Sequence, residues 1–174
     1  MLFSALVAAF GAQAQDSENL ADIFGLKVEE AEKLFEESVG ARRTMTGLVL
    51  ADLLGTTSPE RALEQLGKLP SETLREPVVV AYASAIRCSA FVRQAQLEEA
   101  QSLCATAREY VDDTTDPFLK ARLLAAVQFL AIRQGQLGEA LEYAFEAERW
   151  AAATGHPYVE ATALNSIALT LAFS

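Results

Sequence analysis

Two cysteines pose the most direct chemical question in this sequence. Cys88 and Cys104 lie eight residues to either side of Gln96, on the two sides of the stretch RQAQLEEAQ that begins at Arg93. If this stretch is a turn between two helices, the cysteines are equidistant from it and can face each other. They either form a disulfide, which export from the cytoplasm favours, or remain two small buried thiols. The sequence alone leaves both alternatives open.

Side chains suited to catalysis or metal binding are few. The single histidine, His156, lies in a Gly-His-Pro turn and has no partners at metal-ligand spacing, so a polar loop residue explains it. Acidic pairs such as Glu29–Glu30 and Glu36–Glu37 fit solvated helix faces. No glycine-rich phosphate loop and no Gly-x-Ser-x-Gly motif is present. We therefore expect a protein that is not an enzyme, with no cofactor and no metal site.

The composition narrows the class of partner. The chain has 174 residues, of which 51% are hydrophobic, and this is enough for one domain with a continuous core. Its net charge is −10, and such a surface repels nucleic-acid phosphates and anionic lipids. We expect a protein or peptide partner and no nucleic acid.

An internal repeat organises the helices that must position these residues. RQAQLEEAQ at Arg93 returns as RQGQLGEAL at Arg133, and prolines stand at 77, 117 and 157, always 40 residues apart. A period of about 20 to 50 residues is typical of a solenoid, in which each unit stacks on its neighbours.

The expected fold is all-α, an α-solenoid of antiparallel helix pairs. Apolar spacing and turn residues predict a helical stretch over 27–54 that Gly40 divides, and a short helix from Pro59 with Ser58 as its N-cap. The helix pairs that follow are 77–93 with 97–111 and 117–133 with 137–153, and a last helix starts at Pro157. The units are then 27–69, 77–116, 117–156 and an incomplete 157–174, which indicates a fragment of a longer protein.

The N-terminus has the pattern of a secretory signal peptide. An apolar run from Leu2 to Phe10 precedes Ala12-Gln13-Ala14, so residues 1–14 are the expected signal peptide and 15–174 the domain. The alternative is a terminal amphipathic helix that packs on the domain. We expect a periplasmic or otherwise extracytoplasmic protein, with a cytoplasmic one as the alternative. No segment within 15–174 has the length needed for membrane insertion.

The stretch RQGQLGEALEYAFEAERWAAATGHP, which begins at Arg133, resembles the second half of a tetratricopeptide repeat. The small residues at the helix crossing are Ala140 and Ala147, with Ala100 and Ala107 one unit earlier. Small side chains there allow close approach of two helices. The period of 40 exceeds the usual length of about 34 residues, which implies a variant with longer helices.

The resemblance implies a concave groove lined by the first helix of each unit. A groove of this kind binds an extended peptide. The facing residues that it implies are Tyr82, Ser89, Arg93, Arg122, Phe129, Arg133 and Asn165.

Taken together, these features resemble the extracytoplasmic sensory region of a bacterial signalling protein, such as a membrane-bound diguanylate cyclase. The alternative is a stand-alone envelope scaffold or assembly factor that acts through self-association. Leu164, Ile167 and Leu171 form an apolar stripe on the last helix that lacks its hairpin partner. We expect this stripe to be exposed and the fragment to form a homodimer.

Overall fold

The computed structural model describes residues 20–173 except 113 and 115. The expected signal peptide, residues 1–14, lies outside the described residues. Within the described residues the regular elements are all helices, so the prediction of an all-α fold is confirmed. The N-terminal elements are α2 (Leu20–Phe24), α3 (Val28–Glu37), α4 (Gly40–Gly55), α5 (Pro59–Gly67) and the 3₁₀ turn η1 (Thr73–Arg75).

The C-terminal elements have the predicted boundaries. They are α6 (Pro77–Arg93), α7 (Leu97–Val111), α8 (Pro117–Arg133), α9 (Leu137–Ala153) and α10 (Pro157–Ala172). Proline stands at the start of α6, α8 and α10 because the N–H that it lacks would have no partner in the first turn of a helix. In α8 the Asp116 side chain also caps the helix, by accepting the Leu119 N–H at 3.0 Å.

The repeated turns have the same backbone geometry in both units. Ala95 has φ +60° and Gly135, its counterpart 40 residues later, has φ +75°. In each turn the next residue donates its N–H to a carbonyl five residues back, Gln96 to Phe91 and Gln136 to Ala131, both at 2.9 Å. This is the bonding pattern of a helix end closed by one left-handed residue. The two sequence stretches are therefore similar because they form the same type of turn.

Small residues lie where helices approach each other, as predicted. Ala100, Ala107, Ala140 and Ala147 are all buried. Each of α6 and α8 packs on the helix that follows it, and α6 also packs on α8. The alanines permit these close contacts because a methyl group takes up little space between two helix backbones.

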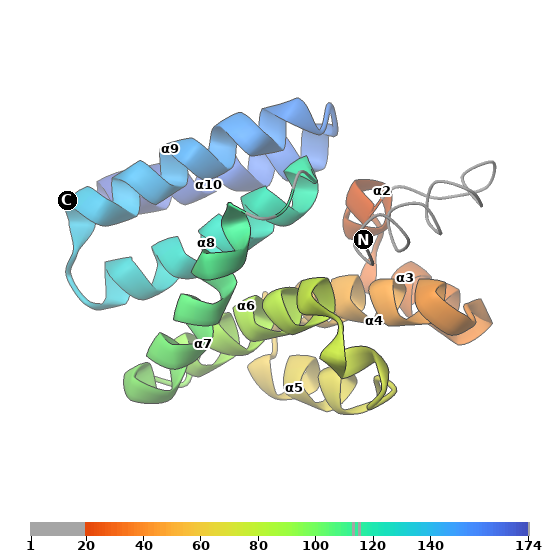
Figure 1. Cartoon of the computed structure of the whole chain (residues 1–174). Coiled ribbons are helices and arrows are strands. Elements are labelled where there is room, and N and C mark those ends of the chain that lie inside the picture. Colours follow the sequence, from red (N-terminus) through yellow and green to blue (C-terminus); the bar gives the residue numbers. More distant parts are fainter. Residues whose placement is uncertain (1–19, 113, 115, 174) are drawn as a thin grey trace.

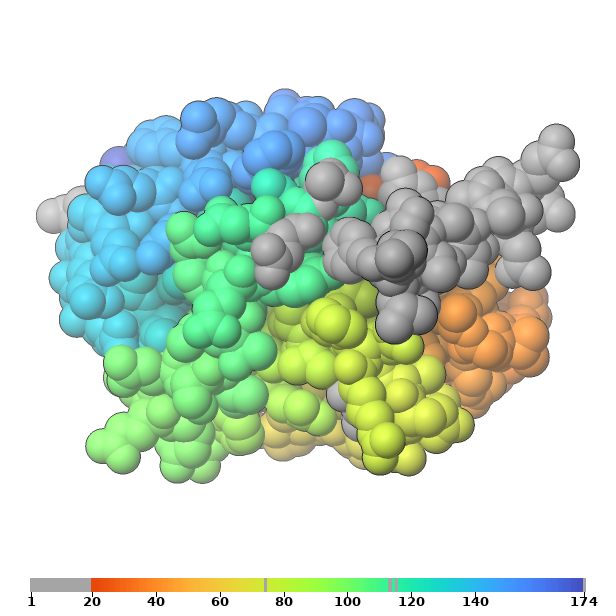
Figure 2. Space-filling model, viewed as in Figure 1, coloured from red at the N-terminus to blue at the C-terminus, as the bar shows by residue number. Residues whose placement is uncertain are grey.

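The order of the helices across the molecule matches their order in the sequence. Figure 2 shows the N-terminal helices and the C-terminal helices on opposite sides, with α6 to α8 between them. One core cluster nevertheless joins the two sides, because it combines Phe24 and Leu48 with Val159 and Ala163. Figure 1 shows α2 next to the starts of α8 and α10. No helix of the described part is both long and apolar enough to cross a bilayer.

Candidate functional site

One face of α8 carries three of the seven side chains that were predicted to bind a ligand. Arg122, Ala125, Phe129 and Arg133 recur at three- and four-residue spacing, so they share a face of the helix. We call these four residues the α8 stripe. Its two arginines lie about 16 Å apart along the helix axis, at about 1.5 Å per residue.

At the N-terminal end of the α8 stripe, Arg122 is held in an internal ion pair. Its Nε and one Nη each donate to a carboxylate oxygen of Asp52 at 2.7 Å. The Tyr82 hydroxyl donates to the same carboxylate at 2.8 Å. Burial disfavours the charged guanidinium, but the Asp52 carboxylate outweighs this effect and holds the pKa of Arg122 above its ordinary value. Burial, followed by the Asp52 charge, raises the pKa of Tyr82 well above its usual value.

The short helix α2 covers this end of the stripe. The ring of Phe24 lies under the guanidinium of Arg122, with the guanidinium carbon 4.4 Å from the ring centroid. The same ring packs against Phe118 and Tyr158, each at 5.6 Å between centroids. Asp22 approaches His156, with 3.5 Å between a carboxylate oxygen and Nε2. The N-terminal end of the stripe is therefore filled by the chain itself.

These contacts correct two expectations about the groove. Tyr82 is only 1% exposed and its hydroxyl is bonded to Asp52, so it belongs to the core and does not face a ligand. Arg122 already has both a carboxylate and an aromatic partner. The sequence contained one signal of this network: Asp52 is a lone carboxylate in the apolar run LVLADLL, and a buried charge needs a partner.

The C-terminal end of the α8 stripe is open. Arg93, Phe129 and Arg133, all predicted groove residues, line a pocket of about 380 Å³. The other lining residues are Val92, Thr56 and Thr57 of the turn after α4, and Pro59 at the start of α5. The guanidinium carbon of Arg93 lies 4.9 Å from the centroid of the Phe129 ring. Helix and turn together thus place two cations and an aromatic ring around one cavity.

The charges around this pocket are unbalanced. Arg93 and Arg133 are both exposed, and within the described part of the chain neither has a carboxylate at ion-pair distance. Glu60 follows the lining residue Pro59 but does not line the pocket, and its carboxylate accepts from the Gln94 amide at 3.2 Å. A backbone hydrogen bond, followed by the bond from Gln94, lowers the pKa of Glu60, so it is ionised at neutral pH.

The structure does not bring the remaining groove residues to this pocket. Ser89 is half-buried on α6 and Asn165 is exposed on α10, and neither lines the cavity. The sequence reasoning missed the turn residues Thr56, Thr57 and Pro59. The motif GTTSP predicted a turn and a helix start, but nothing local showed that this turn would face the ends of α6 and α8.

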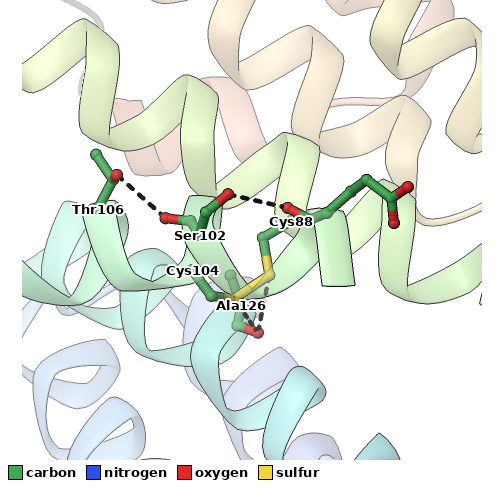
Figure 3. Close-up of a disulfide and its surroundings, with 6 residues drawn as sticks. Cys88, Ser102, Cys104, Thr106 and Ala126 are labelled. Atoms are coloured by element: carbon green, nitrogen blue, oxygen red, sulfur yellow. Dashed lines mark hydrogen bonds between the residues drawn. A yellow bond between two sulfur atoms is a disulfide. The ribbon is translucent and has the colours of Figure 1, made fainter. Parts of the chain in front are cut away.

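The two cysteines are bonded in the structure. Cys88 of α6 and Cys104 of α7 form a disulfide with a Cα–Cα distance of 5.4 Å, and both residues are buried. In Figure 3 the sulfurs lie over the Ala126 carbonyl oxygen of α8, at 3.9 and 3.4 Å. A bonded sulfur has no proton to donate, so these are packing contacts. The disulfide joins α6 to α7 and does not line the pocket, which gives it a structural role.

The last helix presents a separate apolar surface. Leu164 and Leu171 are 49% and 55% exposed, as expected, and Leu169 and Phe173 are exposed as well. Ile167 differs from the expectation because it is half-buried. Leu164 and Leu171 are seven residues apart and share one side of the helix, which we call the α10 face, whereas Leu169 and the C-cap residue Phe173 lie on the other side.

Comparisons with known proteins give no match: no family model, no curated protein and no solved structure is significantly similar to this chain. Among the described residues, no group of three or more His, Cys, Asp and Glu side chains is placed to hold a metal ion. The candidate site therefore rests on the geometry of the α8 stripe.

Proposed function

We propose that this chain is a non-catalytic module that binds a protein or peptide at the open end of the α8 stripe. The observation that carries the proposal is the pocket itself. Arg93, Phe129 and Arg133 surround it, and the described carboxylates leave both guanidiniums without an ion pair. Arginine and aromatic side chains contribute more than other types to protein recognition sites.

The proposal includes a tetratricopeptide-like α-solenoid as the scaffold. Matching turns at Ala95 and Gly135 and buried alanines at equivalent crossings support a repeated helix pair. Stacked pairs of this kind align the first helices of successive units, and this would explain why α6 and α8 contribute to the same pocket.

An extracytoplasmic setting is part of the same proposal. A buried disulfide between Cys88 and Cys104 supports it, because disulfides persist mainly in oxidising compartments. In this setting the module would serve as the sensory or regulatory region of a larger bacterial signalling protein, such as a diguanylate cyclase.

Selection of random peptides displayed on phage tests the binding function. We expect peptides that bind the wild-type protein and lose binding to Phe129→Ala, while a Phe145→Ala variant retains them. Phe145 is the matched control because it is an exposed phenylalanine on α9 outside the pocket. Peptides that bind both variants equally well, or no enrichment at all, would count against the proposal.

A second candidate function is self-association through the α10 face, as an envelope scaffold would use it. In the 40-residue register, Leu164 and Leu171 correspond to Leu124 and Ala131 of α8, both of which are buried. Glu160 is the only side chain of α10 that is charged at neutral pH, so two copies of this helix would meet with little charge repulsion. A second copy of the chain is therefore the occupant that suits this surface.

A further inference from the structure

Each end of the α8 stripe has an arginine stacked on an aromatic ring, but the two arginines differ in burial and in charged partner: the Arg122 side chain is largely buried, whereas Arg93, at the end of α6, is exposed. At the N-terminal end, Arg122 lies against the Phe24 ring and binds the Asp52 carboxylate through two hydrogen bonds. At the C-terminal end, Arg93 lies against the Phe129 ring. The described residues supply no carboxylate to it. From this comparison we infer that the open pocket binds a carboxylate group supplied by the ligand.

The available donors suit this group. An arginine that stacks on an aromatic ring still presents its N–H groups around the edge of the guanidinium, in the fork that matches a carboxylate. Arg133 follows Phe129 by one helical turn and lines the same pocket, so it offers a second fork. Two guanidiniums beside an aromatic ring can hold both oxygens of one carboxylate.

The charge of the surroundings favours a singly charged group. The residues that line the pocket include two guanidiniums and no carboxylate, so the local charge favours an anion. The chain as a whole carries −10, and this charge opposes the approach of a multiply charged anion such as a phosphate ester. A carboxylate with a single charge fits this balance.

This inference rests on the proposed function and specifies the chemical group by which the ligand binds the pocket. A carboxylate can come from a glutamate or aspartate side chain of a peptide, or from a free organic acid. The pocket volume of about 380 Å³ is within the range of small-molecule sites, so it accommodates either source.

Titrations followed by amide NMR test the inference with three probes. The first is a capped Gly-Glu-Gly peptide, the second is its Gly-Gln-Gly counterpart, and the third is glutarate. We expect the glutamate peptide or glutarate to shift the amide signals around Val92, Phe129 and Arg133 in the wild-type protein. Arg93→Gln and Arg133→Gln should each weaken this binding by about ten-fold, since each removes charge-assisted hydrogen bonds.

The control variant is Arg149→Gln, which removes an exposed arginine of α9 outside the pocket and should leave the affinity unchanged. Binding of the glutamine peptide with the same affinity as the glutamate peptide would overturn the inference. Equal weakening by Arg149→Gln, or no response to either carboxylate probe at low salt, would overturn it as well.

The outcomes also separate this inference from the proposed function. Phage-selected peptides that need Phe129 but contain no acidic residue would support peptide binding and contradict the carboxylate site. Binding of glutarate that depends on Arg93 and Arg133, without any peptide binding, would support the carboxylate site and contradict a peptide-binding function.

Discussion

At the scale of single residues, the left-handed turn positions provide a matched pair for testing the repeat. Ala95 and Gly135 occupy equivalent sites with φ near +60° and +75°. Only glycine adopts this conformation without steric cost, whereas alanine pays roughly 1 kcal/mol. No atom lies within 4 Å of a Cβ built on Gly135, so packing does not complicate the comparison there.

We therefore expect Ala95→Gly to raise the free energy of unfolding by about 0.5–1 kcal/mol and Gly135→Ala to lower it by a similar amount. Urea denaturation of the two variants and the wild-type protein measures both changes. Opposite signs support a shared turn geometry, and a destabilised Ala95→Gly variant would contradict it.

Tyr82 gives the protein a specific response to alkaline pH. Its pKa is raised in the folded state, mainly by burial, so above the ordinary tyrosine value of 10.0 the unfolded chain loses this proton while the folded chain retains it. The contribution of the Tyr82 proton to stability is therefore fully present below pH 10. As the pH rises from there toward the folded-state pKa, this contribution falls by about 1.4 kcal/mol per pH unit.

Comparison of Tyr82→Phe with the wild-type protein isolates this effect. The variant loses one hydrogen bond and is less stable at neutral pH, but its free energy of unfolding should fall less steeply above pH 10. Denaturation midpoints at a series of alkaline pH values measure the two slopes. Parallel slopes would show that Tyr82 is not protected from ionisation.

At the scale of helices, the disulfide defines the α6–α7 pair. It closes a loop with a sequence separation of 16, and a loop of this length restricts the unfolded chain by about 3 kcal/mol. We expect the Cys88→Ala/Cys104→Ala substitutions to lower the free energy of unfolding by about 2–4 kcal/mol, so that the variant unfolds at a lower denaturant concentration. Alanine is compatible with the Cys104 site because its counterpart, Ala144, is fully buried.

Chemical denaturation of the oxidised wild-type protein, the reduced wild-type protein and the double variant makes this comparison. The reduced protein should resemble the variant. Equal midpoints for the oxidised and reduced forms would show that the bond does not stabilise the pair.

Much of the helical organisation was predictable from the sequence because its signals are local. Prolines at 77, 117 and 157, the Ser58 cap and the repeated turns fix helix boundaries through neighbouring backbone groups. The site was predictable only in part. Arg93, Phe129 and Arg133 follow from helix periodicity, whereas the Arg122–Asp52 pair joins residues 70 apart and depends on how the helices pack. Insertion of Phe24 under Arg122 is also a long-range event without a local signal.

At the scale of the whole molecule, the α10 face should control association. Burial of a few hundred Å² of apolar surface contributes several kcal/mol at about 25 cal/mol per Å², before the entropy of association is subtracted. We expect the wild-type protein to form a dimer and Leu164→Gln/Leu171→Gln to shift it to the monomer. Sedimentation equilibrium measures both states.

Phe145→Gln is the control for this experiment, since Phe145 is exposed to a similar degree but lies on α9. It should leave the dimer intact. A wild-type protein that remains monomeric at the highest concentration reached would rule out this surface as a dimer interface.

The packing of α2 against α10 affects how the molecule unfolds. In a simple array of repeats, each unit contacts only its neighbours, so terminal units open independently of the rest. Here the ring of Phe24 touches Phe118 and Tyr158, so the first described helix is packed against the start of the last one. Loss of α10 then also removes a contact of α2, and fraying at one end is coupled to fraying at the other. We therefore expect the described domain to unfold as a single cooperative unit and not from its ends inward.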